Sequence, residues 1–310
     1  MDEEIVAHQN DPKSFLRSYS AIIVALLIYS GVVVVAYLRF GTLPEVTLGA
    51  IALVILPCIG LILKSKEFLK SSTLIIAVLL TYEALQGITG YLVNSGRVVS
   101  LAWVDQALVG SDFTLDVQRA FLSPAVTLIS TIFYGLHVFL IMIALGLFWF
   151  KDRSVYRGYS YSLVLTSYLA LLTFVALPTA PPWLAGSAQN LLGAGYKELP
   201  STFQELQKIL LSGESDVVAA FPSLHAAYAT LFSIFMFKLG RRYGLVSLPI
   251  LGGVYFSIIY LGQHFLVDLL GGIAYAGAAT LVVEVMLSRG NRSRSQSRLA
   301  SNASPSASAQ

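Results

Sequence analysis

The chain has little charge. Asp, Glu, Lys and Arg make up 12% of its 310 residues, while hydrophobic residues make up 56% and the mean hydropathy is +0.73. A soluble domain carries about 25% charged residues. So few charges cannot cover a water-facing surface, and lipid must therefore be the main solvent. An ordinary soluble domain is excluded, although the length alone would allow one or two.

Cysteine is almost absent, and the N-terminus lacks a basic stretch. The single cysteine, Cys58, lies in an apolar run, which excludes an intrachain disulfide and a cysteine-based metal site. The first residues, MDEEIVAHQNDPK, are acidic overall rather than basic. They do not resemble a cleavable signal peptide, so we expect the first apolar segment to remain as a membrane anchor.

Long apolar runs are abundant. A membrane span needs about 20 predominantly apolar residues. The runs are continuous rather than alternating, which favours helices over the strands of a barrel. The sequence therefore predicts an all-α, polytopic transmembrane helix bundle of about eight spans, at residues 19–38, 44–63, 72–92, 125–150, 158–178, 221–239, 245–262 and 265–287.

The basic residues are distributed unevenly between the two sides of this bundle. The two termini and the connections on their side carry 15 Lys and Arg, and the opposite side carries 5, which together account for all 20. Cytoplasmic connections are enriched in Lys and Arg. The distribution predicts that both termini are cytoplasmic, and it independently supports an even number of spans.

Four regions follow from this pattern. We expect a cytoplasmic tail over residues 1–18, N-terminal transmembrane helices over 19–92, a membrane catalytic domain over 93–287 and a disordered cytoplasmic tail over 288–310. Two long non-cytoplasmic connections, 93–124 and 179–220, interrupt the catalytic domain. The second contains 203–211, whose pattern is typical of a short amphipathic helix.

Histidine and aspartate at two predicted helix starts indicate phosphate chemistry. Ser223 and His225 follow Pro222 at the start of one span, where free N–H groups and the helix dipole suit a phosphate. His264 and Asp268 are four residues apart and are expected on one helix face. The carboxylate can then accept the Nδ1–H, leaving Nε2 as a nucleophile. Both helix starts fall on the non-cytoplasmic side.

These motifs resemble the type 2 phosphatidic acid phosphatase superfamily. FPSLH at 221–225 and the HxxxD pattern at 264–268 are similar to its second and third signatures. PTAPPW at 178–183 and YGLH at 134–137 resemble segments of the inositol phosphorylceramide synthase branch. The likeness covers roughly residues 100–285, and the motifs occur in the family's order.

The resemblance implies a two-step reaction. His264 would attack phosphorus to form a phosphohistidine, Asp268 would orient it, and His225 would protonate the leaving oxygen and then activate the acceptor. No metal and no cofactor is implied. We further expect seven residues to bind or shape the substrate site: Ser223, His137, Tyr134, Pro181, Trp183, Lys197 and Asp105.

The chain departs from the family at its phosphate clamps. Ser257 occupies its expected position, but Ile258 stands where the third signature has arginine, and the Lys and Arg of the first signature are absent. A phosphodiester needs less positive charge than a phosphomonoester dianion, so these departures favour transfer of a phosphorylated, inositol phosphate-like headgroup between lipids.

Other readings remain open. One is a lipid phosphate phosphatase acting on a phosphatidic acid- or polyprenyl-diphosphate-type substrate. Another is a transporter with a histidine proton relay, which the clustering of ionisable residues at one face disfavours. Singly, each histidine could be structural, and PTAPPW could be only a helix stop. The expected partners are membrane lipids, with no nucleic acid and no obligatory protein partner.

Overall fold

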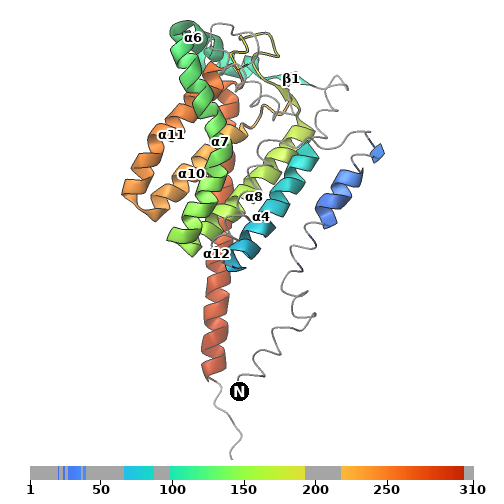
Figure 1. Ribbon diagram of the computed structural model, residues 1–310, viewed down its shortest axis with the longest axis vertical. Helices are drawn as coiled ribbons and strands as arrows, with labels where there is room; N and C mark the ends of the chain where they lie inside the picture. Colours follow the sequence, from blue (N-terminus) through green and yellow to red (C-terminus); the bar gives the residue numbers. More distant parts are fainter. Residues whose placement is uncertain are drawn as a thin grey trace, which may run out of the picture.

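The protein is a bundle of helices that lie side by side. The computed structural model describes residues 66–86, 98–192 and 218–303, and a few helical residues between 20 and 39. Figure 1 shows the long helices running roughly along one direction. They are α4 (Lys66–Gln86), α7 (Pro124–Lys151), α8 (Arg153–Ala176), α10 (Leu224–Leu239), α11 (Arg241–Tyr260) and α12 (Leu266–Ala303).

These helices follow the predicted spans from 72–92 onward. Within the described residues, three helices are long and apolar enough to cross a membrane, α8, α11 and the first 25 residues of α12. A fourth is α7, if its two parts, bent by 50° near His137, form one span. The chain is therefore helical and membrane-embedded.

The predicted number of about eight spans is not confirmed. α10 has 16 residues, fewer than a span needs, and the apolar part of α4 is short. The predicted spans at 19–38 and 44–63 lie largely or wholly outside the described residues.

α10 forms the centre of the bundle. Eight consecutive residues, 226–233, are buried, so the helix is covered on every side. The helices packed around it are α7, α8, α11 and α12. A helix that is apolar all round belongs in such a position. The start of α10, where His225 lies, is thereby held by four neighbours.

Short elements gather at one end of the bundle (Figure 1). Here the sequence predicted a long connection, 93–124, but most of it folds into β1 (Val99–Ser100), α5 (Ala102–Val109) and α6 (Phe113–Phe121). The turn between the helices suits its residues, because Gly110 takes the left-handed conformation with φ 77° and Asp112 caps α6. β1 pairs in parallel with β2 (Thr179–Ala180).

α12 extends well beyond the other helices at the opposite end (Figure 1). It runs to Ala303, past residue 287, where the sequence predicted the last span to end and a disordered tail to begin. The Ser- and Arg-rich stretch from 291 to 303 contains neither proline nor glycine, so no residue there breaks the helix. The predicted amphipathic helix at 203–211 lies outside the described residues.

Candidate active site

His264 lies in the connection between α11 and α12. The sequence placed His264 and Asp268 on one helix face, but α12 begins at Leu266, and only Asp268 is helical. The chain turns before His264 at Gly262, whose φ is +79°. A Cβ at Gly262 would lie 2.3 Å from the carbonyl oxygen of Gln189, so both the turn and the packing require glycine.

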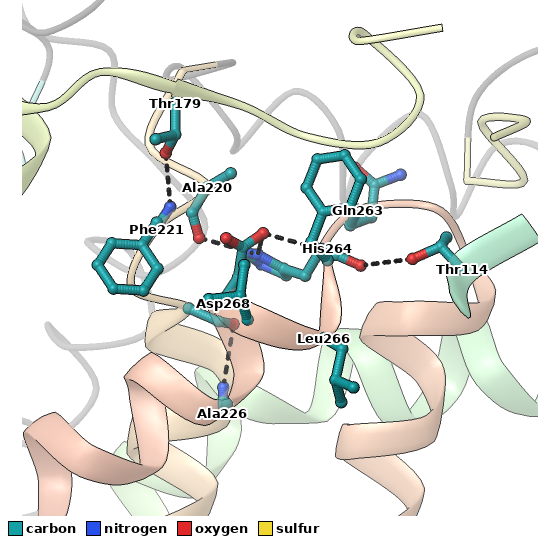
Figure 2. Close-up of polar contacts among 12 residues, drawn as sticks. Thr114, Thr179, Ala220, Phe221, Ala226, Gln263, His264, Leu266 and Asp268 are labelled. Carbon is teal, nitrogen blue, oxygen red and sulfur yellow. Dashed lines mark hydrogen bonds and ion pairs between the residues drawn. The ribbon is translucent and has the colours of Figure 1, made fainter. Parts of the chain in front are cut away.

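The His264 ring is fixed through its Nδ1 atom. Nδ1 lies 3.0 Å from the carbonyl oxygen of Ala220 and 3.5 Å from Oδ2 of Asp268 (Figure 2). A carbonyl oxygen can only accept, so Nδ1 carries the proton and donates it to Ala220. The unprotonated nitrogen of the neutral ring is therefore Nε2, the tautomer that a nucleophile needs.

Asp268 is buried beside this ring. Its Oδ2 accepts the backbone N–H of Phe265 at 2.8 Å, and its own carbonyl accepts the N–H of Ser223 at 3.0 Å. Asp268 thus links the start of α12 to the start of α10. Oδ1 is buried and makes no hydrogen bond within the part of the chain that is described.

Three histidine rings lie next to one another. His225, in the first turn of α10, has its ring centroid 5.5 Å from that of His264 and 3.8 Å from that of His137 on α7. Tyr134 stacks on His225 with centroids 4.3 Å apart. His137 Nδ1 lies 2.8 Å from the Tyr134 carbonyl oxygen, so Nδ1 donates and Nε2 is unprotonated. The fold therefore brings together His137, His225 and His264 from three separate segments.

The segment 178–183 ties these pieces together. Thr179 Oγ1 accepts the N–H of Phe221 at 2.7 Å, just before the start of α10 (Figure 2). Trp183 Nε1 donates to Oε1 of Gln263 at 3.1 Å, next to His264. One short segment thus contacts the chain immediately before His225 and His264.

Comparison with known proteins identifies the family to which this arrangement belongs. A family model described as the PAP2 superfamily matches residues 100–282, well over half of the chain. The chain belongs to the PAP2 superfamily. Every residue of the histidine cluster, and the whole 178–183 segment, falls within the match.

Two curated relatives are similar to this PAP2 chain. An inositol phosphorylceramide synthase of Candida albicans is 28% identical over 141 residues, 42% of this chain and 30% of the relative. A phosphoinositol dihydroceramide synthase of Bacteroides thetaiotaomicron is 26% identical over 152 residues, 44% of this chain and 48% of the relative. The matches thus span less than half the length of either relative. No solved structure matches.

The remaining predicted site residues of this PAP2 chain have varied positions. Ser223 is buried and caps α10, its Oγ accepting the N–H of Ala226 at 3.3 Å. Pro181 is buried in the turn that follows β2. Lys197 lies outside the described residues. Asp105 is fully buried on α5, away from solvent.

Asp105 holds the start of α12. Its Oδ2 accepts the N–H of Leu266 at 2.8 Å, and its Oδ1 accepts that of Val267 at 2.9 Å. Burial raises the pKa of the Asp105 carboxyl above its ordinary value, and these two N–H donors oppose the rise. The first N–H groups of α12 are therefore occupied by carboxylates and are not free for a phosphate.

Sequence reasoning missed several residues that shape the site. Ala220 contributes only its backbone carbonyl, which no side-chain pattern reveals. Thr114 and Gln118 reach the His264 segment from α6, and their signal was a pair of polar residues four apart, on one face of a helix. Within the described residues, no group of three or more His, Cys, Asp or Glu is placed to hold a metal ion.

Proposed function

We propose that the protein transfers a phosphorylated headgroup, of the inositol phosphate type, from a phospholipid to the hydroxyl of a second lipid through a phosphohistidine at His264. The observation that carries this is the pairing of a tautomer-fixed imidazole with a second imidazole. His264 donates from Nδ1 to Ala220 at 3.0 Å, and the His225 ring lies 5.5 Å away. Such a pair suits a nucleophile with its own acid–base group.

In the first step, Nε2 of His264 attacks phosphorus, and the bond from phosphorus to the lipid oxygen breaks. Protonated His225 gives its proton to that oxygen, so the donor lipid leaves as a neutral alcohol. His264 becomes positively charged as it forms the P–N bond, and the Asp268 carboxylate, 3.5 Å from Nδ1, stabilises that charge.

In the second step, the acceptor hydroxyl attacks phosphorus while His225 takes its proton. The P–N bond breaks, His264 returns to its starting tautomer and His225 is again protonated. Atoms and charge therefore balance over the cycle without another reactant. His137, whose ring contacts His225, is proposed to line the substrate site beside it. Tyr134, which stacks on the His225 ring, is proposed to line the same site.

The buried Oδ1 of Asp268 supports a functional reading of this site. A buried polar atom without a hydrogen-bond partner costs about 1–3 kcal/mol, and more when it is charged. Asp268 is 0% exposed and Oδ1 has no such partner within the described part of the chain. An apolar residue there would leave the Phe265 N–H without its acceptor, and it could not stabilise a positively charged intermediate as the carboxylate can.

Hydrolysis is the second candidate, because the same steps with water as acceptor make a lipid phosphatase. The names of the two relatives, both synthases of inositol-containing ceramide lipids, favour transfer. The absence of the family's arginine at Ile258 also favours a diester, which carries one negative charge rather than two.

The test is turnover of purified protein on two headgroup-labelled donors, phosphatidylinositol and phosphatidic acid. Each is offered with ceramide, with diacylglycerol or with neither. We expect labelled product only with phosphatidylinositol plus a lipid acceptor, and none with His264→Ala. Rapid release of phosphate from phosphatidic acid without transfer would establish the phosphatase instead. Full turnover in His264→Ala would reject both.

A further inference from the structure

The two short helices at the site end of the bundle bury polar side chains most deeply. Of the eight residues of α5, only Asp105 is buried, and of the nine residues of α6, only Thr114 and Gln118 are buried. Large apolar side chains of these helices are exposed instead, Trp103 at 68% and Phe121 at 51%. A helix on a water-soluble protein buries its apolar face. The most deeply buried side chains of these helices are therefore polar, while Phe113 and Val117 of α6 also pack partly buried against the core.

All three buried polar side chains bond to the backbone of one segment, residues 260–267. Asp105 accepts the N–H groups of Leu266 and Val267. Thr114 Oγ1 donates to the carbonyl of His264 at 3.2 Å (Figure 2), and Gln118 Nε2 donates to the carbonyl of Tyr260 at 2.9 Å. His264 lies in the middle of this segment, and its ring is not contacted by any of these bonds.

We propose that Asp105, Thr114 and Gln118 form a brace that positions His264, with Asp105 as its principal positioning residue. The proposal rests on the proposed function, in which His264 is the nucleophile. α5–α6 is distant from this segment in the sequence, since Asp105 precedes Leu266 by 161 residues. The brace therefore makes the orientation of His264 depend on a separate pair of helices.

The geometry assigns Asp105 to positioning rather than to substrate binding. Both of its oxygens are used by backbone N–H groups, and the residue is 0% exposed. A carboxylate beside a phosphate would repel it, whereas a carboxylate at a helix N-terminus is favoured by the dipole. Catalytic geometry tolerates about 0.5 Å of error. Asparagine at this position would keep one acceptor oxygen and turn an N–H donor toward a backbone N–H, so we expect the first turn of α12 to shift by more than that tolerance.

The decisive variants are Asp105→Asn and a matched control, Asp112→Asn. Asp112 is also an aspartate at a helix start in this region, but it caps α6, where its side chain accepts the N–H of Leu115 at 3.1 Å. We expect Asp105→Asn to lower kcat about 100-fold, as misplacement of about 1 Å does, with the donor KM changed less than about threefold. Asp112→Asn should stay within about threefold of the parent kcat.

A second pair of variants, at Thr114, tests the brace even if Asp105→Asn does not fold. Thr114→Val keeps the side-chain shape and removes the bond to the His264 carbonyl, and Thr114→Ser keeps the bond. We expect kcat of Thr114→Val to fall about tenfold below that of Thr114→Ser. A tenfold change corresponds to about 1.4 kcal/mol, which is the upper range for the loss of one hydrogen bond. Equal kcat in the two variants, or equal loss in Asp105→Asn and Asp112→Asn, would overturn the brace.

One readout separates this proposal from the proposed function. Diethyl pyrocarbonate modifies unprotonated imidazole nitrogens, and the rate at His264 can be followed by peptide mass spectrometry without any turnover. Asp105→Asn should change that rate at least threefold and Asp112→Asn should not. If His264→Ala retains activity, the proposed function fails while this rate still decides the brace. If His264→Ala is inactive and the rate is unchanged in Asp105→Asn, only the brace fails.

Discussion

At the scale of single residues, the hydrogen-bond acceptor of His264 Nδ1 determines what the ring can do. The sequence suggested Asp268 as that acceptor, from its spacing of four residues. In the structure the Ala220 carbonyl is closer, 3.0 Å against 3.5 Å for Asp268 Oδ2. The carbonyl sets the tautomer, and the carboxylate is left to balance charge on the ring. The sequence predicted that Asp268 would both accept the Nδ1–H and orient the ring, whereas in the structure the Ala220 carbonyl is the nearer acceptor.

The role of His225 as a general acid can be tested by changing the leaving group. His225→Asn should lower first-turnover release of a lipid alcohol from the donor about 10²–10⁴-fold, the usual contribution of a general acid. With a p-nitrophenyl phosphodiester the leaving group needs no proton, so release of nitrophenolate should fall less than about tenfold. Rapid-quench and absorbance measurements give the two rates.

His264→Ala is the control for this comparison, because loss of the nucleophile should abolish release from both donors. An equal loss on both donors in His225→Asn would mean that His225 positions the substrate and does not protonate the leaving oxygen.

At the scale of elements, the catalytic helices are set by close packing of α10 on α12. A Cβ on Gly272 of α12 would lie 2.3 Å from the backbone oxygen of Ser223, which caps α10. Backbone cannot move aside as a flexible side chain does, so no larger residue fits without separating the two helices. This contact holds the start of α10, and with it His225, against α12 and Asp268.

Gly272→Ala should therefore lower both stability and activity. Overpacking of this kind costs about 1–3 kcal/mol. Gly277, on the same helix, has no atom within 4 Å of a built Cβ, so Gly277→Ala should be neutral or stabilising by up to about 1 kcal/mol. Thermal unfolding in detergent, with turnover measured in parallel, checks both. A Gly272→Ala protein as stable and active as Gly277→Ala would contradict this packing.

Tyrosine hydroxyls link neighbouring helices through serine and threonine. Tyr228 pairs with Ser167 at 2.8 Å, and Tyr255 pairs with Thr230 at 2.6 Å. Thr230 Oγ1 also donates to the carbonyl of Ala226 at 2.6 Å, so its oxygen must accept the proton of Tyr255. The same logic applies to Ser167, which donates to Leu163. In each pair the tyrosine hydroxyl is therefore the donor. These two hydrogen bonds connect α10 to both α8 and α11.

Tyr255→Phe should consequently destabilise the bundle slightly. Interhelical side-chain bonds in membranes contribute about 0.6 kcal/mol on average and at most about 1.7. We expect a loss within that range in a reversible unfolding titration. Tyr161→Phe is the control, since Tyr161 is 49% exposed. Its free energy of unfolding should differ from that of the parent protein by close to zero. A loss in Tyr161→Phe equal to that in Tyr255→Phe would show that the bond is not the cause.

At the scale of the whole molecule, the basic residues between α7 and α8 and between α10 and α11 lie at the end of the helices opposite the site, although Arg119 of α6 lies at the site end. α10 begins beside His225 and has Lys238 in its last turn, and α11 begins at Arg241. Lys151 likewise ends α7, far along the helix from its start. Because basic connections stay in the cytoplasm, this polarity supports the proposal that the site faces the non-cytoplasmic side.

Labelling of single cysteines tests that orientation. In a Cys58→Ser background, an impermeant maleimide applied to intact cells should label Asp116→Cys on α6, which is exposed at the site end. Arg289→Cys, at the far end of the apolar part of α12 (Leu266–Gly290), should react only after the membrane is opened, because both termini are proposed to be cytoplasmic. Labelling of Arg289→Cys but not Asp116→Cys in intact cells would reverse the proposed topology.

The sequence by itself determined the solvent, the approximate positions of the apolar helices from residue 72 onward and the three residues proposed for catalysis, His225, His264 and Asp268. These depend on composition, on runs of about 20 apolar residues and on short motifs, all of which are local. It did not reveal α5 and α6, because helices of eight and nine residues are much shorter than the runs of about 20 apolar residues by which spans are recognised.

Only the tertiary structure decided which atoms hold His264 and which histidines meet. The Ala220 carbonyl is 44 residues from His264 in the chain, and Asp105 is 161 residues from Leu266. His137 contacts His225 from a different helix. Backbone groups carry no side-chain signature, and contacts between distant segments depend on how the helices pack. The motif that contains His264 is visible in the chain, but the tautomer of its ring and the contacts of the proposed brace are properties of the fold.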